Sequence, residues 1–297
     1  MEKIISKYSK AIDTKELEKK VKEITGNSKQ LYTAKNLAKI FGLIDLTTLK
    51  ETDTNSLVAS MVNKVNYFHE NFDAQEIPNV AAICVYPPFV EVIKADRKVK
   101  NLKIASVVGS FPSSQTFIEI KEAECKAIAK RGADEADMVI SVGKFLDGDY
   151  ETVFNEIKAL KKALGSVHLK VILESGVLNT PQNIKTASIL AMEAGADFIK
   201  TSTGKTTPAA TLEAAYIMTQ AIAEYFQKTG RMVGFKPAGG IATGTEAVKY
   251  LAIVKHNLGD SWFVSKYFRI GASSLANSIL TEINKLKGIE KPEVAYF

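Results

Sequence analysis

Short apolar runs alternate with amphipathic segments along most of this 297-residue chain, from Phe41 to about residue 280. Each run has the length of a buried strand, and most are separated by a segment long enough for a crossover helix. The predicted strands are 41–47, 80–86, 102–109, 136–142, 168–174, 197–202, 232–239 and 267–273. About eight such units predict an α/β protein with the (β/α)8 TIM-barrel fold.

Two observations favour a closed barrel over an open doubly wound sheet. Runs such as ASVV and VILE are apolar on both faces, which is typical of a parallel sheet covered by helices. No G-x-G-x-x-G follows the first predicted strand, which weakens the dinucleotide-binding alternative. The related segments R-G-A-D (131–134) and A-G-A-D (194–197) each indicate a helix end and an acute turn into a strand.

The first forty residues have a different texture from the rest. They are polar and helix-prone, with Leu17, Val21 and Ile24 at helical spacing. We therefore predict an N-terminal helical extension over residues 1–40, followed by a barrel with a C-terminal tail over residues 41–297. The first ten residues carry charge throughout and lack the apolar centre of a signal peptide.

The bulk composition narrows the classes of function. Hydrophobic residues make up 46% and charged residues 24%, and no window approaches the roughly 20 apolar residues of a membrane span. The 39 basic and 33 acidic residues give a net charge of +6, but the lysines are scattered, so we do not expect nucleic-acid binding. Two cysteines and three well-separated histidines fit neither a disulfide framework nor a metal site. We expect a cytoplasmic protein without a membrane partner, a metal or another cofactor.

Candidate chemistry lies where the apolar runs end, because barrel active sites form at the carboxyl ends of the strands. Lys170, Lys200 and Lys236 fall on three consecutive predicted strands, and Asp137 lies on the strand before them. A structural ion-pair cluster explains one lysine and one aspartate, but it explains three neighbouring lysines less well. Crowded cations lower a lysine pKa from about 10.4 toward neutrality, and a neutral amine attacks carbonyl carbon. We therefore favour Schiff-base catalysis over structural pairing.

Glycine-containing loops follow the last three predicted strands and indicate a phosphate site. Glycines let backbone N–H groups approach an anion, and a following helix start adds a favourable dipole. The loop segments are Gly204-Lys205, Gly239-Gly240 and Gly271-Ala272-Ser273-Ser274. The segment S-T-G-K-T-T also resembles part of a nucleotide-binding P-loop, but Ile199 occupies the position of that motif's first glycine. A nucleotide hydrolase is therefore not expected.

These residues lie in seven ordered motifs that resemble those of the deoxyribose-phosphate aldolases, class I Schiff-base enzymes on a (β/α)8 barrel. The motifs are I-D-L-T-T-L (44–49), A-A-I-C-V-Y-P (81–87), G-A-D-E-A-D-M-V (132–139), L-K-V-I-L-E-S-G (169–176), G-A-D-F-I-K-T-S-T-G-K (195–205), G-F-K-P-A-G-G-I (234–241) and F-R-I-G-A-S-S-L (268–275). The resemblance covers roughly residues 41 to 282, and the N-terminal extension looks more like the longer members.

The resemblance implies reversible cleavage of 2-deoxy-D-ribose 5-phosphate to acetaldehyde and D-glyceraldehyde 3-phosphate. It implies that Lys200 forms the Schiff base, that Lys236 depresses its pKa, and that Asp137 transfers protons with an ordered water. It also implies that the substrate is bound by Asp45, Thr47, Lys170, Gly204, Lys205, Gly239, Gly240, Gly271, Ser273 and Ser274.

The sequence departs from the family pattern in two places. Many members carry an arginine after G-G-I, where this chain has Ala242. Shorter members end in a tyrosine that folds over the site during proton transfer, and here the penultimate Tyr296 is the candidate for that tail proton relay. Two other functions stay open, a metal-independent sugar-phosphate isomerase or epimerase and a catalytically silent sugar-phosphate-binding barrel. The expected partners are a sugar phosphate, aldehydes and further copies of the chain, with a dimer favoured.

Overall fold

The computed structural model describes residues 1–8 and 12–297 and is built around one sheet of parallel strands. The sheet has eight strands in the order β7-β6-β5-β4-β3-β2-β1-β8. The strands are β1 (Ile44–Thr47), β2 (Ala82–Val85), β3 (Lys103–Val108), β4 (Glu135–Val139), β5 (His168–Ile172), β6 (Phe198–Lys200), β7 (Gly234–Lys236) and β8 (Ile270–Ala272). All eight fall inside the predicted apolar runs, or within one residue of them.

Backbone contacts between β7 and β8 close the sheet into a barrel. Arg269 N donates to Phe235 O at 3.1 Å, and Gly271 N donates to Pro237 O at 3.0 Å. Parallel bridges join the same two segments. The predicted (β/α)8 barrel is therefore confirmed, and the carboxyl ends of all its strands open on one face, called here the barrel mouth.

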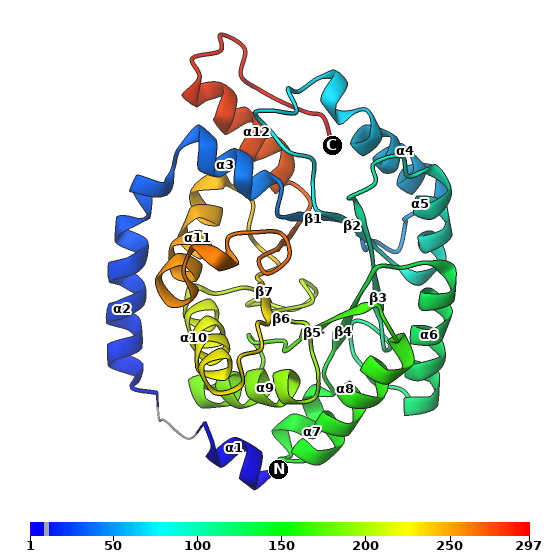
Figure 1. Ribbon diagram of the computed structural model, residues 1–297, viewed down its shortest axis with the longest axis vertical. Coiled ribbons are helices and arrows are strands. Elements are labelled where there is room, and N and C mark those ends of the chain that lie inside the picture. Colours follow the sequence, from blue (N-terminus) through cyan, green and yellow to red (C-terminus); the bar gives the residue numbers. More distant parts are fainter. Residues whose placement is uncertain (9–11) are drawn as a thin grey trace.

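The helices cover the outside of the sheet, as the alternation of apolar runs and amphipathic segments predicts (Figure 1). The eight that follow the strands are α4 (Asn55–Asn66), α5 (Val90–Asp96), α6 (Ile118–Arg131), α8 (Tyr150–Leu164), α9 (Pro181–Glu193), α10 (Leu212–Thr229), α11 (Gly244–Leu258) and α12 (Leu275–Leu286). The short helices are α7 (Val142–Leu146) and the 3-10 turns η1 (Asn27–Leu31), η2 (Phe68–Glu70), η3 (Pro87–Phe89) and η4 (Asp260–Trp262). No helix among the described residues is long and apolar enough to cross a membrane.

The two G-A-D segments enter their strands by the same device. Asp134 Oδ2 accepts from Ile104 N at 2.9 Å, and Asp197 Oδ2 accepts from Leu169 N at 2.8 Å. Each carboxylate thus accepts from the amide of the second residue of the preceding strand, at the amino end of the barrel. Gly132 ends α6 in the left-handed conformation, with φ of 96°, which glycine adopts without steric cost.

The N-terminal residues form helices α1 (Glu2–Ser6), α2 (Thr14–Gly26) and α3 (Ala34–Phe41). Figure 1 shows α2 along the outer side of α10 and α11, and α3 beside α12. Leu17, Val21 and Ile24 are buried on the inner face of α2, as their spacing predicts. The helical character of this region is confirmed, while its assignment as a separate unit ending at residue 40 stays a prediction.

Candidate active site

Lys200 ends strand β6 at the barrel mouth, and its side chain is buried. The strand is three residues long, with two apolar residues before the lysine, so Lys200 is its only charged residue. Its Nζ lies 2.8 Å from Oδ2 of Asp137, across the interior on β4, and only 3% of Lys200 is exposed.

Lys236 lies beside Lys200, because the two residues are register partners on β6 and β7. Its Nζ donates to the same Asp137 Oδ2 at 2.8 Å and lies 2.5 Å from Asp45 Oδ2 on β1. Lys236, Asp137 and Asp45 are all fully buried. The structure thus brings together the three residues predicted to be catalytic and one of those predicted to bind substrate.

A second tier of charges lies below these residues. Lys170 Nζ contacts Glu135 Oε2, lies 3.2 Å from Asp137 Oδ1 and 3.5 Å from Asp45 Oδ2. Arg269 bridges two carboxylates, with Nη1 at 2.6 Å from Asp45 Oδ1 and Nη2 at 2.7 Å from Glu135 Oε1. The two tiers therefore form one continuous network inside the barrel.

The network carries one more positive than negative charge. Its cations are Lys170, Lys200, Lys236 and Arg269, and its anions are Asp45, Glu135 and Asp137. All seven are at most 4% exposed, so the excess charge is poorly solvated. Loss of one proton from a lysine neutralises it.

The lysine that gives up its proton most readily is Lys200. Burial lowers its pKa, the attraction of Asp137 opposes this, and the nearby Lys236 lowers it further, so that the pKa falls below its ordinary value. Burial also acts to lower the pKa of Lys236, but Asp137 and Asp45 outweigh it and the pKa rises. Lys200 is therefore the member of the pair that loses its proton more readily, while Lys236 holds its proton more tightly.

Asp137 is an ionised hydrogen-bond acceptor in this environment. Burial acts to raise its pKa, but Lys170, Lys200 and Lys236 outweigh that effect and hold the pKa well below its usual range. Both of its oxygens accept from lysines, Oδ1 from Lys170 and Oδ2 from Lys200 and Lys236. The carboxylate therefore links Lys200 and Lys236 to Lys170 through its two oxygens.

Glu135 and Arg269 belong to the network but were not among the residues predicted from the sequence. Glu135 lies two positions before Asp137 on β4, so strand alternation puts both side chains on the inner face. Arg269 lies two positions before Gly271 and directly precedes β8. Counting by two from a residue already assigned to the interior would have found Glu135.

The inner wall on the β2–β3 side is apolar. It is formed by Leu49, Cys84, Ala105 and Val107, with Tyr86 and Phe111 packed at its rim. Burial, reinforced by Asp137, raises the pKa of the Cys84 thiol, so Cys84 is neutral. The barrel interior is thus charged on one side and apolar on the other.

The glycine loops after β6 and β7 meet each other at the mouth. Gly204 and Gly239 have φ of 78° and 87°, and a side chain on Gly239 would lie 3.2 Å from Gly204 Cα and 2.6 Å from Ala209 Cβ. Gly240 also has positive φ. The predicted phosphate loops are therefore adjacent. Lys205 instead points to the loop after β1, where its Nζ donates to Leu49 O at 2.6 Å.

A groove of about 720 Å³ runs from β1 to the first turn of α12. Thr47, Ser273 and Ser274 line it, and both serines are exposed. Gly271 has a different surrounding, because a side chain there would lie 3.0 Å from Cε of Lys236. Ser273 and Ser274 can therefore reach a ligand in the groove, whereas Gly271 makes room for the lysine.

The C-terminal tail borders this groove on the outside of the barrel. Asn277 holds the tail by two hydrogen bonds. Its Nδ2 donates to Phe297 O at 2.9 Å, and its Oδ1 accepts from Tyr296 N at 2.9 Å. The Tyr296 hydroxyl donates to Lys64 O at 2.7 Å. The proton relay suggested for Tyr296 would require the tail to leave these contacts, and it stays a prediction.

Ala242 lies in the loop before α11, where its backbone N donates to Glu246 Oε2 at 2.9 Å. Glu246 and Thr243 form the capping box that begins the helix. The position that carries arginine in many family members is thus exposed and next to a helix start. In this chain it supplies backbone groups only.

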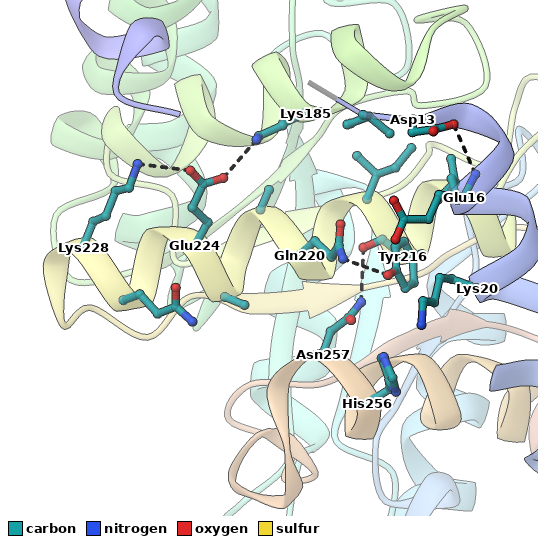
Figure 2. Close-up of a pocket in the computed structure, with 16 residues that line it drawn as sticks. Asp13, Glu16, Lys20, Lys185, Tyr216, Gln220, Glu224, Lys228, His256 and Asn257 are labelled. Atoms are coloured by element: carbon teal, nitrogen blue, oxygen red, sulfur yellow. Dashed lines mark hydrogen bonds and ion pairs between the residues drawn. The ribbon is translucent and has the colours of Figure 1, made fainter. Parts of the chain in front are cut away.

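A second cavity, of about 580 Å³, lies outside the barrel between α2, α10 and α11 (Figure 2). Figure 2 shows Lys185 and Lys228 pointing to Glu224, with Nζ–Oε distances of 2.9 and 3.1 Å. Of the described residues that line this cavity, none belongs to the predicted site. Three of its charged groups, Lys185, Glu224 and Lys228, pair with each other.

Comparisons with known proteins agree with this geometry. The family model of the DeoC/LacD family aldolases matches residues 40–280 of this chain. The deoxyribose-phosphate aldolase of Homo sapiens is 41% identical over 264 residues, 86% of this chain and 83% of the human protein. That of Mus musculus is 42% identical with the same coverage. The solved deoxyribose phosphate aldolase of Aeropyrum pernix shares the fold, with a TM-score of 0.66, 24% identity and coverage of 90% and 97%.

Proposed function

This chain belongs to the DeoC/LacD family of aldolases, and we propose that it cleaves 2-deoxy-D-ribose 5-phosphate reversibly to acetaldehyde and D-glyceraldehyde 3-phosphate. The observation that carries this proposal is the placement of Lys200, a buried lysine with a lowered pKa inside a network with one excess positive charge. A neutral lysine amine is the nucleophile that a class I aldolase needs.

In the proposed reaction Lys200 Nζ adds to the C1 carbonyl of the open-chain sugar, and loss of water gives an iminium. The iminium nitrogen accepts the electron pair of the C2–C3 bond as that bond breaks. The C3 hydroxyl gives up its proton toward Asp137, so that C3 becomes the aldehyde carbon of glyceraldehyde 3-phosphate. The two-carbon enamine then takes a proton at C2, and hydrolysis of the resulting iminium releases acetaldehyde.

Lys236 has two tasks in this proposal. Its charge helps to keep Lys200 neutral, and its hydrogen bond to Asp137 Oδ2 holds the carboxylate that exchanges protons with the substrate. Asp45 and Lys170 would hold the substrate hydroxyls or the network around them, and Asp45 already contacts Lys236. The apolar wall around Cys84 and Val107 offers a surface without charge to the two-carbon unit.

We propose that the phosphate binds between the loops after β6, β7 and β8. Gly204, Gly239 and Gly240 offer backbone N–H groups there, and Ser273 and Ser274 are exposed at the start of α12. Thr47 lies on the same groove as the serines and would contact the sugar. Lys205 would have to exchange its bond with Leu49 O for the phosphate.

Borohydride trapping tests the proposed chemistry. Reduction in the presence of acetaldehyde should leave an ethyl group on Lys200, located by peptide mass spectrometry. The Lys200→Arg variant, which keeps the charge but not the nucleophile, should not be labelled there and should not turn over. An isomerase, an epimerase or a silent binding barrel would give no adduct, and an adduct on another lysine would also contradict the proposal.

We also propose that the protein works as a cytoplasmic homo-oligomer, a dimer by preference. Phe117 and Ile120, at the start of α6, are 79% and 58% exposed and offer an apolar contact surface. The cysteines Cys84 and Cys125 are both free, which fits a reducing compartment. Light scattering should report twice the chain mass, and Phe117→Asp should lower it; a monomeric wild type would contradict the proposal.

A further inference from the structure

Glu174 follows strand β5 by two residues and has an unusual backbone. Its φ is 55°, in the left-handed region that residues other than glycine seldom adopt. The residue is also only 3% exposed, so its carboxylate is withdrawn from water. A residue that combines backbone strain with a buried charge must be held by specific bonds, and such residues cluster at functional sites.

The hydrogen bonds to the Glu174 carboxylate come from the loop after Lys200. Oε1 accepts from Thr203 N at 3.1 Å, and Oε2 accepts from Thr203 Oγ1 at 2.6 Å. The same Thr203 Oγ1 accepts from Lys205 N at 3.0 Å. Both carboxylate oxygens therefore bind one threonine, and the hydroxyl of that threonine in turn holds the backbone amide of Lys205.

These bonds fix the backbone on both sides of Gly204. Its amide lies between the anchored amides of Thr203 and Lys205, and its φ of 78° turns the chain toward Gly239. The same loop is anchored at its start, where Ser175 N donates to Thr201 O at 2.8 Å. The direction of the Gly204 N–H therefore depends on Glu174.

We propose that Glu174 is a positioning residue that orders the loop of Thr203, Gly204 and Lys205 for the phosphate of the substrate. The inference rests on the proposed function, since it assumes that this loop binds phosphate. Glu174 acts through Thr203 and does not itself touch the substrate. Each of its oxygens accepts one hydrogen bond from Thr203, so the buried carboxylate is turned toward the loop backbone that it orders.

The expected signature is a difference between phosphorylated and unphosphorylated substrates. In Glu174→Gln the amide oxygen can accept from one of the two Thr203 donors, and the NH2 group would face the other and loosen the loop. The KM for 2-deoxyribose 5-phosphate should rise about tenfold, the loss expected for one hydrogen bond to a charged group. The kcat/KM for unphosphorylated 2-deoxyribose should stay within about twofold of the wild type, because that substrate does not use the loop.

A second variant and a matched control separate positioning from folding. Thr203→Val removes the bridging hydroxyl but keeps the side-chain shape. Like Glu174→Gln, it should lower the ratio of kcat/KM for 2-deoxyribose 5-phosphate to kcat/KM for 2-deoxyribose. The matched control is Asp197→Asn. The Asp197 carboxylate also accepts from a backbone amide, that of Leu169 on β5, but it lies at the amino end of the barrel. It should lower thermal stability without changing that ratio.

The affinity for D-glyceraldehyde 3-phosphate, measured by calorimetry, provides a readout that needs no turnover. We expect it to fall about tenfold in Glu174→Gln, whether or not Lys200 reacts. The inference is overturned if this affinity is unchanged, or if both substrates lose kcat/KM equally. Failure of the proposed function would show separately, as absence of acetaldehyde trapping on Lys200 in the wild type.

Discussion

Lys200 and Lys236 donate to the same oxygen, Oδ2 of Asp137, and each Nζ–Oδ2 distance is 2.8 Å. The two ammonium groups are held close because their residues are register partners on adjacent strands. One carboxylate oxygen cannot fully compensate two neighbouring cations, so the less well paired lysine loses its proton more easily. Lys236 has a further carboxylate partner in Asp45, so Lys200 is the lysine whose pKa is lowered.

We expect Lys236→Leu to move the rising limb of the kcat–pH profile to higher pH by about one unit. The reactive form of Lys200 is the neutral amine, whose fraction grows as the pH rises through the lysine pKa. Lys236 lowers that pKa, so its removal raises it, and a higher pH is needed for the same activity. The profile is measured with 2-deoxyribose 5-phosphate at saturating concentration.

The matched control for this variant is Lys185→Leu. Lys185 is also buried, at 7% exposure, but it lies on the outer cavity and pairs with Glu224. Its replacement should lower stability and leave the pH profile in place. An unshifted profile for Lys236→Leu would remove Lys236 from the role assigned to it.

Asp137→Asn should separate Schiff-base formation from turnover. Asp137 raises the pKa of Lys200 by attraction, so its loss lowers that pKa further and leaves the amine neutral. Trapping with acetaldehyde and borohydride should persist, and at lower pH than in the wild type. Turnover should fall by a factor of about 100 or more, because proton transfer to and from the substrate loses its carboxylate.

Asp134→Asn is the control on the same segment of chain, since Asp134 binds Ile104 N at the amino end of the barrel. It should retain turnover. Equal losses of trapping and turnover in Asp137→Asn would mean that Asp137 acts before the iminium forms, against the mechanism proposed above.

The sequence alone predicted the barrel and the position of Lys200, Lys236 and Asp137, because strand ends follow from apolar runs and all meet at one mouth. It did not reveal that Arg269 and Glu135 complete the charge balance. Their contacts run across the barrel between β4 and β8, and the stagger of the strands sets which residues meet there.

Long side chains and the tail were also beyond sequence reasoning. Lys205 follows a glycine in a loop of phosphate-binding type, yet its Nζ reaches Leu49 O on another loop. The spacing of residues does not determine where a flexible four-carbon stem points. The Tyr296 hydroxyl likewise depends on where Asn277 and Lys64 hold the tail, and those contacts span 19 and 232 residues.

Gly271→Ala should impair catalysis through Lys236. The added Cβ would lie 3.0 Å from Lys236 Cε and 2.9 Å from Ala238 Cβ, tighter than ordinary contact, so the lysine stem must move. We expect kcat to fall about tenfold and the free energy of unfolding to fall by about 1–3 kcal/mol, as for other overpacked sites. Steady-state kinetics and urea unfolding measure the two effects.

Gly143→Ala gives the comparison for Gly271→Ala. Gly143 lies in α7 with nothing within 4 Å of the added carbon, so its replacement should leave kcat unchanged. If Gly271→Ala also kept wild-type kcat, close packing against Lys236 would not matter for the reaction.

Arg269→Lys should destabilise the protein at neutral pH by about 3 kcal/mol. A lysine cannot bridge Asp45 and Glu135 as the planar guanidinium does, so buried carboxylate oxygens lose partners. Burial acts to raise the pKa of Asp45, but Lys236, Lys170 and Arg269 together hold it below its ordinary value. The stabilisation from this carboxylate is therefore full above its unfolded pKa of about 3.9 and is lost as the pH falls. The difference between variant and wild type in urea unfolding should shrink below about pH 4.

The control is Lys287→Ala, which breaks an exposed pair with Glu76 and should cost less than about 1 kcal/mol at any pH. An Arg269→Lys variant as stable as wild type at neutral pH would show that the lower tier of the network is not needed to hold the barrel together.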